Sequence, residues 1–116
     1  MPRRKERNFI TFNDGILDVC QVKNRKIIRT KIKGLRFGYR TVGVKRFYEA
    51  KVVSDKIDEV VSIPQSPQIT TLDICIIRGI QYKIVQTQNK YDSLPASTFL
   101  SLERVVTLYE DVRESG

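Results

Sequence analysis

The chain has 116 residues, of which 41% are hydrophobic, and a formal net charge of +8. This length is enough for one small domain, and this composition excludes global disorder. No apolar run approaches the ~20 residues of a membrane-spanning helix, and no secretory signal follows the basic N-terminus. We therefore expect no membrane partner, and a protein made in the cytoplasm and used there or within an assembly.

The N-terminal part of the chain carries β-strand patterns. Residues 1–7 are expected to form a flexible basic arm. The Asn-Asp-Gly motif at 13–15 lies between two β-forming runs and predicts a hairpin, because glycine accepts positive φ without steric cost. A second extended stretch is expected at 26–32, and a strand over 35–40 follows in which apolar and basic residues alternate.

Residues 41–53 show a different pattern, in which apolar side chains recur at helical spacing. The segment is expected to be a short amphipathic helix or a long loop. Two interpretations of Phe47 and Tyr48 stay open here, since these side chains either pack in the core or lie exposed at an interface.

The β pattern resumes at 57–63 and stops at Pro64, which lacks the N–H that a sheet requires. The clearest hairpin of the chain joins 72–77 to 80–86 through the Arg-Gly pair at 78–79. Its second strand alternates apolar and polar residues, which predicts one buried and one exposed face.

The C-terminal part is expected to contain a polar loop, one long strand over 98–109 and a flexible acidic tail, 110–116. Short strands separated by frequent turns predict an all-β fold. We expect a small β-barrel or sandwich of about seven short antiparallel strands, with a long basic loop or short helix, in a single domain over 8–109.

Positive charge is concentrated in one stretch of the chain. Residues 21–51 contain eleven Lys and Arg against one acid, Glu49, whereas 52–116 contain six basic and nine acidic residues. A field this uneven on a small domain points to a polyanionic partner, or to an acidic surface that the stretch must face. Solvated like charge is the alternative interpretation.

Histidine is absent, which excludes Ser-His-Asp and Cys-His catalysis and most zinc sites. Four carboxylates are the only candidates for acid–base or metal chemistry, and their positions are those of ordinary solvated residues: Asp55, Asp58, Glu59 and Asp73. No phosphate-binding loop or nucleophile elbow is present. We predict that the chain is not an enzyme and has no catalytic residue, metal site or cofactor.

The two cysteines, Cys20 and Cys75, each lie in an apolar stretch that is typical of a strand. Their spacing matches no zinc site or redox pair. Buried, reduced thiols are the expected state, and a single bridge between them is the alternative.

Aromatic residues interleave with the basic ones between 35 and 48. Small β-barrels bind single strands with such aromatics and a cationic groove. Over 35–40, however, the two kinds of residue alternate and therefore face opposite sides of a strand. An OB-like single-stranded nucleic-acid-binding module is kept as the alternative function.

Several motifs occur in a characteristic order: the Asn-Asp-Gly turn, an Arg-Thr-Val-Gly-Val-Lys-Arg-Phe-Tyr-Glu-Ala run at 40–50, the strand ending in Pro64, the hairpin around Gly79, and a proline-containing loop before 101–105. In this order the chain resembles the head–tail connector (head closure or stopper) proteins of tailed bacteriophages, especially those of the Gram-positive siphovirus type. The likeness covers roughly 13–106, and its most specific part is the run at 40–50.

The resemblance implies a homo-oligomeric ring, a dodecamer, that closes the head below the portal after DNA packaging. It implies a portal or adaptor protein above the ring, a tail completion or terminator protein below it, and non-specific contact with packaged double-stranded DNA. The protein would be made in the host bacterial cytoplasm and reside in the virion at the head–tail interface.

The family acts through its surfaces, so the resemblance implies contact residues and no reactive ones. The matching run implies interface or channel contact for five residues: Arg40, Lys45, Arg46, Phe47 and Tyr48. The preceding basic residues would face DNA or the portal: Arg25, Lys26, Arg29, Lys31, Lys33 and Arg36. Such extra charge before the run is more than the family leads us to expect, and it leaves DNA and an acidic portal surface as alternatives.

Overall fold

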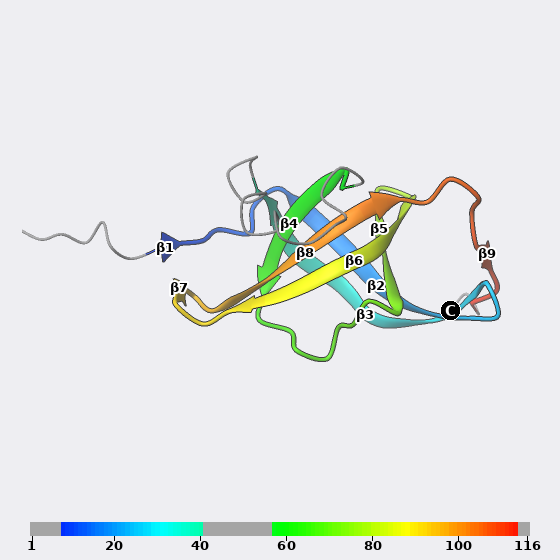
Figure 1. Cartoon of the computed structure of the whole chain (residues 1–116), viewed down its shortest axis with the longest axis horizontal. Helices are drawn as coiled ribbons and strands as arrows, with labels where there is room; N and C mark the ends of the chain where they lie inside the picture. Colours follow the sequence, from blue (N-terminus) through cyan, green and yellow to red (C-terminus); the bar gives the residue numbers. More distant parts are fainter. Residues whose placement is uncertain (1–7, 41–56, 114–116) are drawn as a thin grey trace, which may run out of the picture.

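The computed structural model describes residues 8–40 and 57–113 and contains six strands that close into a barrel (Figure 1). These strands are β2 (Gly15–Lys23), β3 (Lys26–Tyr39), β4 (Glu59–Pro64), β5 (Asp73–Ile77), β6 (Ile80–Lys90) and β8 (Ser97–Arg104). Their order around the ring is β2-β5-β6-β8-β4-β3, all neighbours are antiparallel, and pairing of β3 with β2 completes the circle. The all-β barrel expected from the sequence is confirmed.

Three strands of two residues lie outside the ring: β1 (Asn8–Phe9), β7 (Ser93–Leu94) and β9 (Glu110–Asp111). Strand β1 pairs in parallel with β7, which lies in the connection between β6 and β8. Strand β9 pairs in parallel with the start of β3. Both ends of the described chain are therefore attached to the barrel by backbone hydrogen bonds.

Alternate residues of the six strands fill the interior, because successive side chains of a strand point to opposite faces. The buried cluster consists of Leu17, Val19, Phe37, Val61, Ile63, Ile69, Cys75, Ile77, Tyr82, Ile84, Leu100 and Leu102. Ile69 is the one member of this cluster that comes from a connection rather than a strand. Burial of this apolar surface is the main term that stabilises the barrel.

The first long hairpin lies at a different place from the one expected at 13–15. Strand β2 turns into β3 through Asn24 and Arg25, whose φ angles of 53° and 61° form a tight two-residue turn. The backbone N–H of Asp14 donates to the Phe37 carbonyl at 2.9 Å, and the Asp14 carboxylate accepts from the Tyr39 N–H at 2.7 Å. The Asp-Gly pair thus holds the end of β3 instead of reversing the chain.

Strand β3 combines the two stretches that the sequence analysis kept apart. It runs over 14 residues and shifts register against β2 near Gly34, where φ is +69°. The N–H of Gly34 donates to the Asp18 carboxylate at 2.8 Å, which secures the bulge. The apolar and basic residues of the strand's end do lie on opposite faces, since Phe37 is buried in the barrel and Arg36 is exposed.

The hairpin of β5 and β6 forms at its predicted place, with the turn at Arg78 and Gly79, which both have positive φ. Strand β6 is longer than expected, because 87–90, assigned to the polar loop, pair with β8. Pro64 ends β4 as expected, and the connection to β5 follows. Strand β8, in contrast, ends at Arg104 and not at Tyr109. After Val105 the chain leaves the sheet and crosses toward β3, where β9 forms.

The segment before β2 covers one outer face of the barrel. Ile10 and Phe12 pack on Val60 of β4 and Phe99 of β8. This cover needs a close approach of two backbones, because a side chain at Gly38 would place its Cβ 2.5 Å from the Thr11 carbonyl oxygen.

A second cover is made by the segment after β8. Tyr109 packs on a cluster around Ile27 of β3, and the side chain of Gln81 binds both the carbonyl and the N–H of Tyr109, at 3.1 and 2.9 Å. Residues 110–113, which the sequence analysis assigned to a flexible tail, continue along β3. There Arg113 donates to Thr30 at 2.9 Å and to the Asp111 carboxylate, which lowers the pKa of Asp111.

We predict that Gly38→Ala lowers the free energy of unfolding by about 2 kcal/mol, because the added methyl group must displace the backbone at Thr11. Gly34→Ala is the matched control. It meets no atom within 4 Å, and its cost of about 1 kcal/mol comes only from positive φ. Urea denaturation of the two variants measures the difference, and an equal or smaller effect at Gly38 would contradict the close packing of the N-terminal segment.

Candidate functional site

The predicted basic site begins in the β2–β3 turn, where its charges contact the C-terminal segment. The guanidinium of Arg25 lies over the Tyr109 ring, 5.1 Å from its centroid. Lys26 lies 4.0 Å from a carboxylate oxygen of Glu110, in an exposed ion pair. Both residues thus contact the C-terminal segment of the same chain, and Lys26 alone faces an opposite charge there.

Lys31 has a structural role. Its Nζ lies 2.8 Å from the Asp73 carboxylate and donates to the Gln68 carbonyl at the same distance. Asp73 is only 4% exposed and also accepts the N–H of Thr70 at 2.9 Å. The pair holds the connection between β4 and β5 against β3, so this lysine is occupied inside the fold rather than directed at a partner.

Two basic residues of β3 remain available to a partner. Lys33 and Arg36 are exposed, and the side chain of neither forms a hydrogen bond or ion pair with any residue in 8–40 or 57–113. Arg29, also exposed, donates to the side chain of Gln21 across the hairpin. The basic residues of β3 before the bulge thus contact their own chain, whereas Lys33 in the bulge and Arg36 beyond it do not.

Arg40 is the only member of the predicted interface run that the structure describes. Its guanidinium lies over the Phe99 ring at 5.1 Å, on the outer face of the barrel, and its backbone N–H donates to the Val60 carbonyl at 2.7 Å. The other four residues lie outside the described residues: Lys45, Arg46, Phe47 and Tyr48. Arg40 is therefore fixed on the barrel at the point where the basic run begins.

A set of polar side chains surrounds this point, and the sequence analysis did not single it out. Within the described part of the chain, the buried side-chain atoms that lack a hydrogen-bond partner are Arg40 Nε, Gln86 Oε1, Gln88 Oε1 and Ser101 Oγ. The register places Gln86 opposite Ser101 and Gln88 opposite Phe99. Buried polar groups are normally paired, so the four atoms without a partner are exceptional among the described residues. The signal in the sequence is the alternation of the two Gln residues in β6.

The candidate carboxylates do not form a site in the described residues. Asp58 accepts the backbone N–H of Arg104 at 2.7 Å, at the end of the barrel where β4 begins, whereas Asp73 lies at the other end, where β5 begins. Asp55 is outside the described residues. Over 8–40 and 57–113, no group of three or more Cys, Asp or Glu is arranged to hold a metal ion.

Cys20 and Cys75 are free and buried, as expected. Cys75 faces the barrel interior, whereas Cys20 lies under the C-terminal cover, where Arg113 donates to its sulfur at 3.4 Å. Burial raises the pKa of both thiols. The thiolate that would react or bind a metal is thereby disfavoured.

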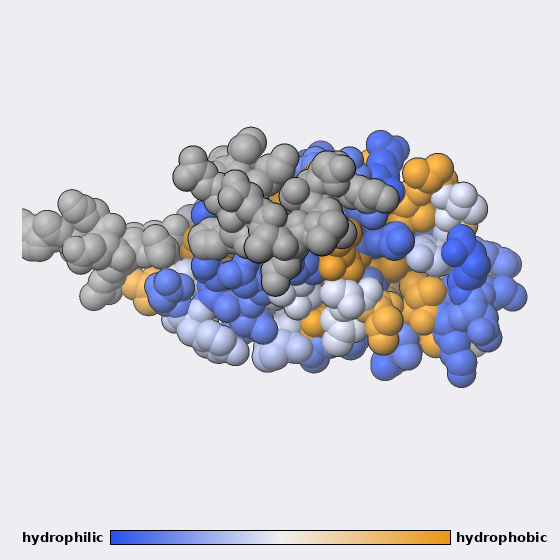
Figure 2. All heavy atoms as spheres, in the orientation of Figure 1, coloured by the Kyte–Doolittle hydropathy of each residue, from blue (hydrophilic) through white to orange (hydrophobic). Residues whose placement is uncertain are grey.

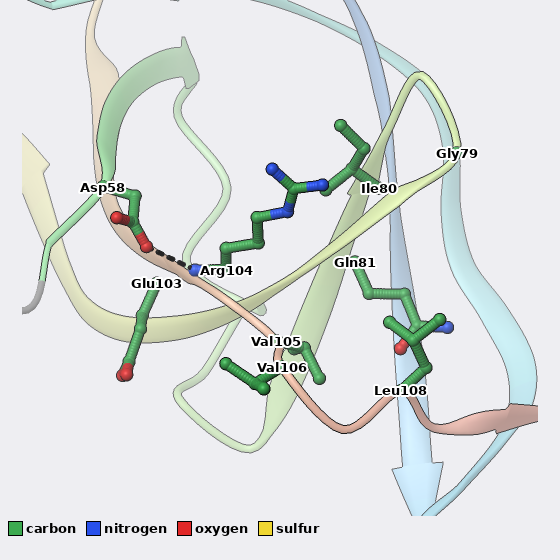
Figure 3. Close-up of a pocket in the computed structure, with 9 residues that line it drawn as sticks. All are labelled: Asp58, Gly79, Ile80, Gln81, Glu103, Arg104, Val105, Val106 and Leu108. Carbon is green, nitrogen blue, oxygen red and sulfur yellow. Dashed lines mark hydrogen bonds between the residues drawn. The ribbon is translucent and has the colours of Figure 1, made fainter.

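A cleft of about 710 Å³ opens at the end of the barrel beside the β5–β6 turn (Figure 3). Its walls include Ile80, Gln81, Glu103, Val105, Val106 and Leu108. Val106 and Leu108 are 93% and 66% exposed, and hydrophobic side chains gather over the loop after β8 in Figure 2. Figure 3 shows the carboxylates of Asp58 and Glu103 on one side of the cleft and the Arg104 guanidinium on the other, beside Ile80.

The sequence analysis missed this cleft because it continued the last strand through Tyr109. The cleft exists because β8 ends at Arg104 and the chain turns away. The signal available in the sequence was weak, since Val-Val-Thr-Leu at 105–108 is a good β-forming run. Only the end of the sheet leaves 106–108 exposed.

Comparison of the chain with protein-family models, with curated proteins and with solved structures finds no match. In the residues that the structure describes, no helix has the length and apolar character to cross a membrane.

We predict that Lys31→Met lowers the free energy of unfolding by about 2 kcal/mol, because it leaves the buried Asp73 carboxylate without its cation. Lys33→Met, a matched change two residues along the same strand, should alter it by no more than about 0.5 kcal/mol. Chemical denaturation of both variants measures the effect. Equal stability of the two would show that Lys31 is as free as Lys33.

Proposed function

We propose that the chain is a structural subunit of the phage head–tail connector, which forms a ring below the portal, closes the head after packaging and offers the attachment surface for the tail. The observation that supports this most directly is the division of charge along β3. The basic residues of its first half contact other side chains of the same chain, and two of them, Lys26 and Lys31, face acids. The side chains of Lys33 and Arg36 have no such contact in the described residues, and they lie between that half and the basic run that starts at Arg40.

The division of charge fits a subunit that must both hold itself together and face a polyanion. Packaged DNA carries one negative charge per ~1.7 Å of helix axis, so a protein around it is subject to a strong and sequence-independent attraction. The run at 40–51 contains Arg40, Lys45, Arg46 and Lys51 against Glu49 alone. Because Arg40 is anchored on Phe99, the run starts from a rigid wall of the barrel.

The available surfaces also fit a ring. Cyclic assemblies with a single kind of subunit use heterologous contacts, in which one patch of a subunit meets a different patch of its neighbour. The barrel offers a basic, exposed section of β3 and, separately, the apolar cleft after β8. Partner binding through such surfaces requires no reactive group.

The OB-like single-strand binder is less well supported by the geometry. A stacking platform needs exposed aromatic rings beside cations. Phe37 is fully buried in the barrel, and the Tyr39 ring packs edge-on against it with 5.0 Å between centroids. The described aromatic residues of the basic stretch thus belong to the interior and its rim.

The decisive experiment is electron microscopy of the protein mixed with portal rings of the phage that encodes it. We expect a ring below the portal with the wild-type chain, and loss of DNA retention or tail joining in particles that carry Lys45→Glu and Arg46→Glu. Each subunit of the ring would then present two negative charges to the packaged DNA, and the repulsion is repeated in every copy. Circular dichroism should show that the variant is folded.

The matched control changes exposed residues outside that run and outside the cleft, Lys23→Glu, Gln68→Glu and Thr71→Glu together, for the same change in net charge. Control particles should keep their DNA. If the protein forms no ring on the portal, or if the two variants behave alike in infectious particles, the proposed function is wrong.

Binding of DNA by the free chain separates the two candidate functions. We expect weak binding without base preference, falling at least tenfold between ~50 and ~200 mM salt, because diffuse Lys and Arg contacts release counterions. Fluorescence anisotropy with duplex and single-stranded oligonucleotides measures it. Base-specific binding to single strands that persists at ~0.5 M salt, beyond this electrostatic regime, would favour the OB-like module instead.

A further inference from the structure

The exposed apolar surface at one end of the barrel divides into a cleft and a projection. The cleft lies between β6 and the loop after β8, with Val106 and Leu108 on its outer wall. The projection is Ile16 of β2, which is 61% exposed. In the hairpin register Ile16 lies directly opposite Arg36, so an apolar side chain and a free cation stand together on one face.

The cleft and the projection lie on two sides of the same turn. Gly79 of the β5–β6 turn lines the cleft, and it also lines the smaller hollow of about 440 Å³ beside Ile16. Both surfaces are therefore at the same end of the barrel, on either side of one turn. A heterologous contact between copies requires two different patches of this kind on each subunit.

The two surfaces are also complementary in chemistry. The cleft is lined by aliphatic side chains and has the Asp58 and Glu103 carboxylates on one side (Figure 3). Two positive groups lie near these carboxylates. The Arg104 guanidinium points toward Ile80, on the other side of the cleft. Lys83 lies opposite Glu103 in the β6–β8 register but forms no ion pair with it. An aliphatic side chain flanked by a cation fits this wall.

We propose that the barrel-end cleft of one subunit binds Ile16 and Arg36 of a second copy of the chain, so that the apolar side chain enters between Ile80 and Val106 and the guanidinium faces Glu103. The inference rests on the proposed function, because a closed ring needs two different surfaces that fit each other. Burial of Ile16, Val106 and Leu108 removes exposed aliphatic surface on both copies, which drives association.

The test uses cysteines placed on the two surfaces. One chain carries Ile16→Cys, another Val106→Cys, and the control carries Leu72→Cys, an 81% exposed position at the opposite end of the barrel. The native Cys20 and Cys75 are buried and contribute little background. Equal mixtures are oxidised at concentrations up to about 1 mM, where contacts as weak as millimolar are populated.

We expect a disulfide-linked dimer from the Ile16→Cys and Val106→Cys mixture, and at most a fifth of that yield when Leu72→Cys replaces either one. A mixture that gives no more dimer than the Leu72→Cys control overturns the proposal and leaves the cleft for another protein. Dimers of Val106→Cys with itself, at the same yield, overturn it too, because they indicate a symmetric contact.

A charge exchange tests the polar part of the contact. Arg36→Glu or Glu103→Arg alone should lower the dimer yield roughly two- to fivefold, the range of one exposed ion pair, and the two changes together should restore it. Losses that add in the double variant overturn the pairing. Because the measurement uses the free chain, it is independent of the portal. A ring on the portal without this cross-link would refute the contact and leave the proposed function intact.

Discussion

Closure of the barrel depends on β3, which pairs with β2 along most of its length but with β4 only at Gly38 and Tyr39. Because only two residue pairs join β3 to β4, the first half of β3 has no β4 partner. There the connection between β4 and β5 contributes Ile69 to the core. The ion pair of Lys31 and Asp73 ties that connection down. The rest of the fold follows from this joint, since Asp14 holds the end of β3 and the Gly34 bulge lets one strand turn from β2 toward β4.

The two covers solve a common problem of small barrels, whose outer faces carry apolar side chains with no second sheet to bury them. Phe99 is covered by the N-terminal segment and Ile27 by the C-terminal one. Each cover is fastened by a few polar contacts, such as those of Gln81 with Tyr109. The apolar residues that remain exposed after this, among them Ile16 and Val106, are therefore more informative about partners than they would be on an uncovered barrel.

Net charge overstates the cationic surface that a partner meets. Of the six basic residues assigned to a DNA or portal surface before Arg40, four contact other side chains of the same chain, and two, Lys33 and Arg36, are free within the described residues. Three of the four contact residues far away in the sequence, such as Tyr109 and Asp73, and Arg29 contacts Gln21 across the hairpin. Basic residues of one strand can thus have two roles. Those before the bulge at Gly34, such as Lys31, stabilise the fold, and the exposed ones at and after the bulge are available to a partner.

The sequence by itself determined the all-β class, the β5–β6 hairpin and the burial of both thiols, because these follow from local alternation, from Gly79 and from apolar context. It also located the basic stretch, though not which cations are free. The hairpin predicted from the Asp-Gly pair at 14–15 was wrong, because Asp14 instead forms hydrogen bonds with the end of β3. The end of β8 at Arg104 was likewise decided by the tertiary structure. Residues 105–108 favour a strand, but only Val105 still bonds to β6, through the Gln81 carbonyl. Local propensity does not predict which distant segments pair. That pairing determines where β3 meets β4 and where β8 ends, and so it determines the position of the cleft.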